Sequence, residues 1–471
     1  MAGQLGYYRQ TMKEITENKT NIYLRALALA VPMMVQNGVT NAVMLVDNLM
    51  VGTLGTESIT AVAVVTQIIF VFNLAIFGAI SGPGIYCAQF YGQKSSEGFG
   101  NVFRLKLLVC FLVFLIGLAI FIFGGPQLIG MFVNGSTTGI NNEVTLGLGL
   151  QYLYAMLWGF LPFCITQVYA SSLRETEESV IPMVSGLAAV VADIVFNYLL
   201  IFGKFGFPCW GVKGAAVATV ISRLVEMAVL LVWIFIRKKR FEYVTSALNR
   251  LSFRFSGMKT VLVKSLPMFL NEFLWAAGFA LTFQAYSLRG VEVVAALNIA
   301  NAIFNVMIVL IFAMGSSTGI IIGQMLGASE FDEARNNAFK LTGFNGCLGA
   351  FLMLIMLCFT KYFPSCYETS EQVRSLAETF IIVNAIYLPF CGILNSLYFT
   401  LRSGGKTFVT FFFDGVFSIV IACPVALILA KYSSLDIVPL YAIVQSLDII
   451  KIAIGYFMVK KGVWISSLVT Q

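Results

Sequence analysis

Long runs without a single charged residue restrict what this chain can fold into. Seven such runs cover residues 26–46, 58–93, 107–142, 144–173, 293–329, 341–360 and 379–401. Each meets or exceeds the roughly 20 apolar residues that a helix needs to cross the hydrocarbon core of a bilayer. Only 11% of the residues are charged, whereas soluble domains carry about 25%. The sequence therefore predicts an all-α integral membrane protein that crosses the bilayer many times.

The residue types that are missing exclude several kinds of active site. The chain has no histidine, which excludes a Ser-His-Asp triad and most zinc and haem sites. Its nine cysteines lie mostly in apolar runs and form no C-x-x-C pair, so neither a disulfide framework nor a metal site is indicated. We expect no enzyme, no metal beyond a coupling cation, and no cofactor.

Charges and turn signals divide the chain into twelve predicted spans. These cover 23–50, 59–85, 101–123, 147–170, 180–202, 212–236, 259–287, 293–321, 336–359, 374–398, 406–430 and 437–460. With both termini on one side, 22 of the 30 Lys and Arg residues fall on that side and 6 on the other. Because cytoplasmic loops are rich in Lys and Arg, both termini are predicted to be cytoplasmic. The net charge of +7 is thus explained by topology, and we expect no nucleic-acid partner.

The two halves of the chain resemble each other. At an offset of 235, residues 27–101 align with 262–336 without a gap and with 17 identities, among them Pro32 with Pro267. Six spans per repeat keep both copies in the same orientation, as in transporters with parallel repeats and a central substrate site. We predict an N-terminal lobe (1–236), a cytoplasmic linker (237–258) and a C-terminal lobe (259–471).

Polar side chains gather on one sector of the first span and on one face of the fifth. At 100° per residue, Gln36, Asn37 and Asn41 share a sector with Asp47. In the fifth span, Asp193 and Asn197 are four residues apart and therefore share a face. Since a charged group within a span is usually functional, Asp47 and Asp193 are predicted to line one cavity. Two carboxylates there could carry a proton or ligate Na⁺.

The second half does not copy this chemistry. Thr282 aligns with Asp47, and Glu272 aligns with Asn37. The candidates for a substrate cavity in this half are Glu272, Asn298, Asn301 and Asn384, although Asn in a bundle can also join helices structurally. Pro32 and Pro267 each remove a helical hydrogen bond and are predicted hinges. The pairs Arg223 with Glu226 and Asp448 with Lys451 are three residues apart, and we interpret both as structural ion pairs.

No nucleotide-binding motif is complete. The stretch "TLRSGGKT" at 400–407 lacks the first glycine of a P-loop and lies in a membrane loop. Without ATP, transport energy must come from an ion gradient.

The stretches "LALAVPMMVQNGVTNAVMLVDNLMVGTLG", "GLAAVVADIVFNYLLIFGKFGFPCWGVKGAAVATVISRLVE" and "NEFLWAAGFALTFQAYSLRG" resemble the MATE family of multidrug and toxic compound extrusion transporters. The resemblance implies two V-shaped six-helix lobes with alternating access, and export of amphipathic, often cationic, compounds in exchange for H⁺ or Na⁺. It also implies a cation-coupling role for Asp47. Many relatives have Asn and then Asp in the fifth span, whereas this chain has Asp193 and then Asn197, and Thr219 could add an oxygen.

The leading hypothesis is a multidrug antiporter of the cell membrane that functions as a monomer and binds small organic substrates. Two alternatives remain at this point. A lipid-linked glycan flippase shares the helical plan but typically has a cationic cavity, and an ion channel would show unitary currents and no saturation by substrate.

Overall fold

The computed structural model describes residues 21–133, 141–238, 241, 243–245 and 258–469, and these residues form helices without any strand. Its longer helices are α2 (Ile22–Gly52), α3 (Thr56–Gly92), α4 (Ser96–Val133), α5 (Asn142–Glu175), α6 (Val180–Phe202), α7 (Gly211–Ile236), α9 (Met258–Ser287), α10 (Val291–Gly327), α11 (Phe331–Cys358), α13 (Glu371–Ser403), α15 (Cys423–Tyr432) and α16 (Ile437–Lys461). Shorter segments are η1 (Lys204–Gly206), α12 (Tyr362–Ser365), α14 (Thr407–Thr410), η2 (Phe411–Val416) and η3 (Ser418–Ala422).

Twelve helical stretches among the described residues are long and apolar enough to cross a membrane. Each overlaps one of the twelve predicted spans, although several helices are longer than predicted, such as Ser96–Val133 against 101–123; α14, η2, η3 and α15 together make the eleventh, Thr407–Tyr432. Large apolar side chains such as Phe123, Trp158 and Ile116 are 81%, 80% and 60% exposed, which suits contact with lipid. The prediction of an all-α integral membrane fold with twelve spans is confirmed.

The chain divides into two compact units, each described here by itself. The first contains the described residues up to Met34, Ala88–Ser95 and the chain from Thr260 on; the second contains Val35–Cys87 and Ser96–Lys259. Both α2 and α3 therefore contribute to both units. The predicted lobe bounds 1–236, 237–258 and 259–471 stay a prediction.

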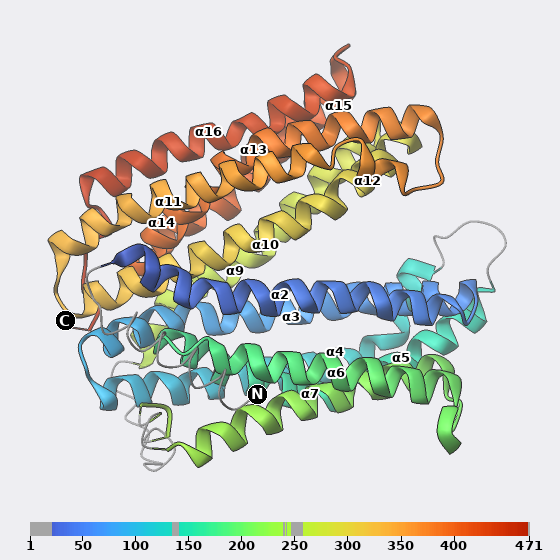
Figure 1. Cartoon of the computed structure of the whole chain (residues 1–471), viewed down its shortest axis with the longest axis horizontal. Helices are drawn as coiled ribbons and strands as arrows, with labels where there is room; N and C mark the ends of the chain where they lie inside the picture. The colour runs from blue at the N-terminus through green and yellow to red at the C-terminus, as the bar shows by residue number, and fades with distance from the viewer. Residues whose placement is uncertain (1–20, 134–140, 239–240, 242, 246–257, 470–471) are drawn as a thin grey trace. The chain divides into compact units, whose positions relative to one another are not determined.

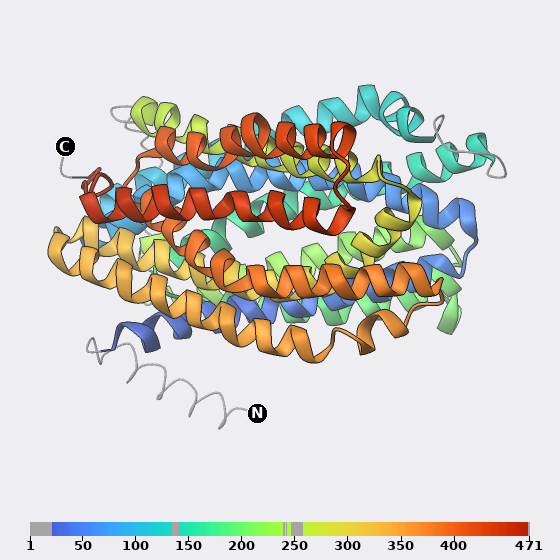
Figure 2. The ribbon, with the colours of Figure 1, turned by 90° about the horizontal axis from the view of Figure 1, so that it is seen from above.

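The core of the first unit lies around α13. This helix packs against α10, α11 and α16, which run beside it in Figure 1 and again in the turned view of Figure 2. Phe380 and Leu388 of α13 are fully buried in one apolar cluster. A second cluster joins Leu401 to Leu29 of α2 and to Trp464, which follows α16.

A contact between α3 and α10 in the first unit repeats the duplication of the sequence. Ala88 and Gly92 correspond to Gly323 and Gly327 at the offset of 235. A methyl group on Gly92 would lie 1.9 Å from the Gln324 carbonyl oxygen, and one on Gly327 would lie 1.9 Å from the carbonyl oxygen of Gln89. The two helices thus approach through equivalent small-xxx-small motifs, which membrane helices use for close packing.

In the second unit, α7 packs against α5 and α6, and α4 packs against α5. Phe72, Phe121 and Phe160 form an aromatic cluster in which Phe72 and Phe160 are stacked with centroids 4.5 Å apart. A buried ion pair lies in the same unit, with Lys106 Nζ 2.6 Å from Glu175 Oε2.

The eleventh span departs from a regular α-helix. Segments η2 and η3 are π-helical, and π turns in helices are frequent at functional sites. Within this segment the Gly415 N–H donates to Asn271 Oδ1 of α9 at 2.9 Å, so a side chain from a neighbouring helix contacts the backbone of the wide turn.

Parts of the predicted linker, including Lys239, Arg240 and residues 246–257, lie outside the described residues. Phe241 and Val244 are 3% and 1% exposed, and Tyr243 contacts Phe99 edge to face with centroids 5.7 Å apart. This portion of the linker therefore packs on the start of α4.

Candidate functional site: a bridged carboxylate pair

The carboxylates of Asp47 and Asp193 lie on either side of one amide group. Asn197 is one turn after Asp193 on α6, and its Nδ2 donates to Asp193 Oδ2 at 3.1 Å and to Asp47 Oδ1 at 2.8 Å. Because both bonds share Nδ2, these two carboxylate oxygens are less than about 6 Å apart, within the range of a strong mutual electrostatic interaction. The three residues that the sequence singled out on α2 and α6 are thus together.

Two oxygens of this group are buried without a hydrogen-bond partner. Asp193 is 6% exposed and Asn197 is 1% exposed, and Oδ1 of each lacks a partner. Leaving a buried acceptor unpaired costs about 1–3 kcal/mol, so such atoms call for an explanation. A cation bound beside the carboxylates would supply one.

Helix α7 contributes hydroxyl groups beside Asp193. Thr219 and Ser222 are close enough to interact with its carboxylate, although both donate to the backbone of their own helix, Thr219 to Ala215 O and Ser222 to Thr219 O. Their lone pairs remain available as acceptors. Thr219 was predicted here. Ser222 was not, although its position three residues further along the same helix could have indicated it.

Two other neighbours were missed by the sequence reasoning. Tyr152 of α5 is 7% exposed and lies near both Asp47 and Asp193. Arg223, which we interpreted as a partner of Glu226, makes no ion pair with it in the described part of the chain. Its guanidinium lies over the Phe163 ring at 4.7 Å, close enough to Asp193 for an electrostatic interaction.

The other predicted residues of α2 are arranged differently. Gln36 Oε1 accepts a hydrogen bond from Arg174 Nη2 at 2.9 Å, so its acceptor is already engaged. Asn37 is exposed and Asn41 half-buried.

The predicted cavity residues of the second half differ in burial. Glu272 and Asn384 are buried, Asn301 is half-buried and Asn298 is exposed. Asn384 Oδ1 accepts from the Tyr441 hydroxyl at 2.7 Å and from Gln445 Nε2 at 3.3 Å. Among the described hydrogen bonds, none joins two of these four predicted residues.

Both predicted hinge prolines lie inside continuous helices, Pro32 in α2 and Pro267 in α9. Pro32 is three residues before Val35, where α2 passes from the first unit to the second. Their role as hinges stays a prediction.

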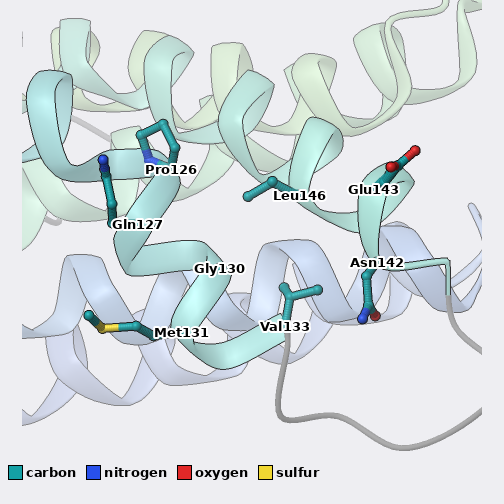
Figure 3. A pocket seen from close by; sticks show the side chains of 8 residues that line it. All are labelled: Pro126, Gln127, Gly130, Met131, Val133, Asn142, Glu143 and Leu146. Atoms are coloured by element: carbon teal, nitrogen blue, oxygen red, sulfur yellow. The ribbon is translucent and has the colours of Figure 1, made fainter.

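A pocket of about 520 Å³ lies elsewhere, between the end of α4 and the start of α5 (Figure 3). It is lined by eight residues that include Pro126, Met131 and Glu143. None of the predicted site residues lines it, so it does not serve as the predicted substrate cavity.

The described residues contain no group of three or more His, Cys, Asp or Glu side chains that could hold a metal ion. The donors at the bridged pair are instead two carboxylates, one amide and nearby hydroxyls. Such a set of hard oxygen ligands suits a small cation or a proton.

Comparisons with known proteins agree with this architecture. The sequence model of the MatE family matches twice, at residues 32–199 and 267–428, which confirms the duplication. The chain is 24% identical over 429 residues to the probable multidrug resistance protein YoeA of Bacillus subtilis, covering 89% of this chain and 90% of that protein. It is also 24% identical to the probable multidrug resistance protein NorM of Neisseria meningitidis, covering 77% of each.

Solved structures share the fold. A MATE crystal structure in the straight conformation matches with a TM-score of 0.83 at 18% identity, over 94% of this chain and 96% of that one. The MATE transporter VcmN of Vibrio cholerae in the bent form matches with a TM-score of 0.81 at 17% identity, over 97% and 100%. With its two matched repeats, its twelve spans and these relatives, the chain belongs to the MatE family of MATE multidrug efflux transporters.

Proposed function

We propose that this protein is a secondary antiporter that exports amphipathic, cationic organic compounds in exchange for H⁺ or Na⁺. The proposed cation-coupling residues are Asp47, Asp193, Asn197 and Thr219. The observation that carries the proposal is the bridged carboxylate pair with two unpartnered buried oxygens, Asp193 Oδ1 and Asn197 Oδ1. A cation bound there would satisfy both oxygens and offset the charge of the acids.

A single coupling cation supplies enough energy for export of a neutral substrate. One elementary charge that moves through 100 mV releases about 2.3 kcal/mol. At about 1.4 kcal/mol per tenfold concentration ratio, this supports a substrate gradient of roughly fifty-fold. If the substrate is itself a monovalent cation, one positive charge leaves with the substrate for each positive charge that enters with the coupling ion. The membrane potential then does no net work, and export depends on the concentration gradient of the coupling ion.

The charge of the one acid among the candidate cavity residues favours a cationic cargo. Glu272 is buried in the C-terminal half, and Gln36, Asn37, Asn41, Asn298, Asn301 and Asn384 are neutral polar residues that we propose as additional cargo contacts. Relatives such as YoeA and NorM are named as multidrug resistance proteins, which supports a broad range of small organic substrates.

We further propose that the protein is a monomer in the cell membrane with both termini in the cytoplasm. The distribution of Lys and Arg supports this orientation. A cysteine-accessibility experiment on residues of the terminal segments in intact cells tests it.

Efflux from proteoliposomes tests the coupling mechanism. The protein is reconstituted with a fluorescent cationic dye, and a pH gradient and a Na⁺ gradient are imposed separately. We expect one of the two gradients to drive dye transport in the wild type, and we expect Asp47→Asn and Asp193→Asn to abolish that dependence.

Glu143→Gln is the matched control, because Glu143 is an exposed acid of the second unit at the start of α5. It should transport as the wild type does. Gradient-driven efflux that persists unchanged in both Asp variants would contradict the proposed role of the carboxylates.

A further inference from the structure

A second polar cluster lies in the first unit, around the ammonium group of Lys451 on α16. Lys451 is 5% exposed, and its Nζ is 2.9 Å from Asp414 Oδ1 and 3.4 Å from Asp448 Oδ1. The Phe413 and Phe417 rings lie 5.9 and 5.6 Å from Nζ. The cluster therefore holds two carboxylates around one cation that is part of the chain.

The second oxygen of each carboxylate is held by a neighbouring helix. Asp414 Oδ2 accepts from Asn271 Nδ2 of α9 at 3.5 Å, and this amide also donates to the Tyr398 hydroxyl at 3.1 Å. Asp448 Oδ2 accepts from the Tyr387 hydroxyl of α13. With these oxygens occupied, Oδ1 of both acids is directed to the ammonium, as the ligands of a bound ion would be.

The corresponding helices of the two halves build both clusters. In the first half, the bridged pair lies on the first and fifth spans, α2 and α6, with α7 beside them. In the second half, Asn271, Asp414 and Lys451 lie on the seventh, eleventh and twelfth spans. The family model matches the two halves separately, so α9, the eleventh span and α16 are the counterparts of α2, α6 and α7.

The two clusters differ in where their positive charge comes from. In the described part of the chain, no Lys or Arg forms an ion pair with Asp47 or Asp193, and two oxygens there lack a partner. In the second half, Lys451 provides the cation itself. Two carboxylates that lie close together and largely out of solvent repel each other, and a cation from solution or from the chain would relieve that repulsion.

We propose that Lys451 is a built-in cation that permanently fills a second cation-binding cluster, formed by Asp414 and Asp448, and keeps Na⁺ and other small monovalent cations out of it. One consequence is that the coupling ion binds only in the N-terminal half. That consequence rests on the proposed function, whereas the occupancy of the Asp414–Asp448 cluster by Lys451 does not.

Lys451→Met tests this role with little change in packing. Methionine reproduces the side chain of lysine in length as far as the atom before Nζ, and it is apolar and flexible enough to remain between Phe413 and Phe417. The substitution leaves a vacancy of about the size of the ammonium between two Oδ1 atoms. A small cation such as Na⁺ could occupy this vacancy.

The binding of radioactive Na⁺ is measured on the purified full chain in lipid nanodiscs, at alkaline pH so that protons compete least, with choline as the replacement cation. Asp47→Asn and Asp193→Asn are present throughout to remove the N-terminal site. We expect no saturable Na⁺ binding in this background and a single bound Na⁺ after Lys451→Met is added. Adding Asp414→Asn as well should remove that ion.

Absence of Na⁺ binding in folded, monodisperse Lys451→Met protein would overturn the proposal, and so would equal binding in protein that retains Lys451. If Lys451→Met does not fold, Lys451→Gln gives the same comparison with a neutral polar end. Protein with Asp47 and Asp193 intact is measured in parallel. Its failure to bind Na⁺ would count against Na⁺ as the coupling ion, and would leave the result for Lys451 unaffected.

Discussion

Gly92 and Gly327 allow α3 and α10 to approach each other, and substituting them tests the pseudosymmetric contact. A methyl group on either residue would lie 1.9 Å from a carbonyl oxygen of the opposite helix, Gln324 or Gln89, whereas real Cβ atoms essentially never come closer than 3.0 Å. The helices must therefore separate by about 1 Å or more. Backbone atoms cannot rotate away as a side chain can, so we expect Gly92→Ala and Gly327→Ala each to cost about 1–3 kcal/mol.

The double substitution is the informative case. Two independent sites would add their costs, but a single separation of the two helices makes room for both methyl groups. We therefore expect the double variant to be destabilised little more than either single variant, a coupling of roughly 1–3 kcal/mol. The side chain of Gln89 resists this separation, because it donates to Ser403 O at 2.9 Å and accepts from the Leu468 N–H at 2.7 Å.

The assay is the unfolding temperature of the purified protein in detergent. Gly343→Ala is the matched control, because a methyl group on Gly343 of α11 would have no atom within 4 Å. If the destabilisation of the double variant equals the sum of the two single variants, each methyl group is accommodated locally. If the single variants unfold at the same temperature as the wild type, the close approach of α3 and α10 is refuted.

Three further predictions concern buried polar contacts. Lys106→Met should cost about 3–5 kcal/mol, because it leaves the Glu175 carboxylate buried without its ammonium; the yield of monodisperse protein measures this, and adding Glu175→Gln should restore part of it. Asn271→Ala should cost about 1–3 kcal/mol, because it removes the side-chain oxygen that accepts from the buried Gly415 N–H. The measurement is the unfolding temperature, which should fall in this variant and should not fall in the control Asn298→Ala, where the residue is exposed. Tyr441→Phe should cost about 1 kcal/mol by removing the hydroxyl that donates to Asn384 Oδ1, and it should alter the KM for dye because Asn384 is a proposed cargo contact; an unchanged KM would mean that Asn384 only joins helices.

The spans could be predicted from the sequence because their signal is local. A run of apolar residues longer than the bilayer requires a helix wherever it lies in the chain. The π-helical segments of the eleventh span could not be predicted in this way. The Gly415 N–H of this segment donates to Asn271, which is 144 residues away in the chain, so a tertiary contact that no local pattern reveals accompanies the irregularity.

Apart from the grouping of Asp47 with Asp193, the site was predictable only within one helix at a time. Helical spacing placed Asp193 and Asn197 on one face, and it also paired Asp448 with Lys451. Among the described residues, the same spacing did not produce an ion pair between Arg223 and Glu226, and the Arg223 guanidinium lies over the Phe163 ring instead. The contact between Asp414 and Lys451 joins two different spans, the eleventh and the twelfth. It depends on how these helices are rotated about their axes, and local sequence spacing does not give that rotation.

Lys106 shows how a buried charge can escape sequence analysis. It was counted only as one of the basic residues that indicate topology, because it lies near the beginning of a span. In the structure it is 0% exposed, and its Nζ contacts Ser171 Oγ at 2.8 Å and both oxygens of Glu175 at 2.7 and 2.6 Å. A lysine with three donors and this many acceptors is fully satisfied.

Lys106 and Asp193 are both buried charged residues of the second unit, and we expect the first to have a structural role and the second a functional one. Lys106 and Glu175 satisfy each other, so removing one partner should reduce the amount of folded protein. Asp193 has a buried oxygen without a hydrogen-bond partner, and its replacement by an uncharged isostere removes the cost of burying a charge. We therefore expect Asp193→Asn to leave the yield of folded protein unchanged or higher while ion-driven transport per molecule is lost, and Lys106→Met to show the opposite pattern. Equal losses of yield in both variants would contradict this division.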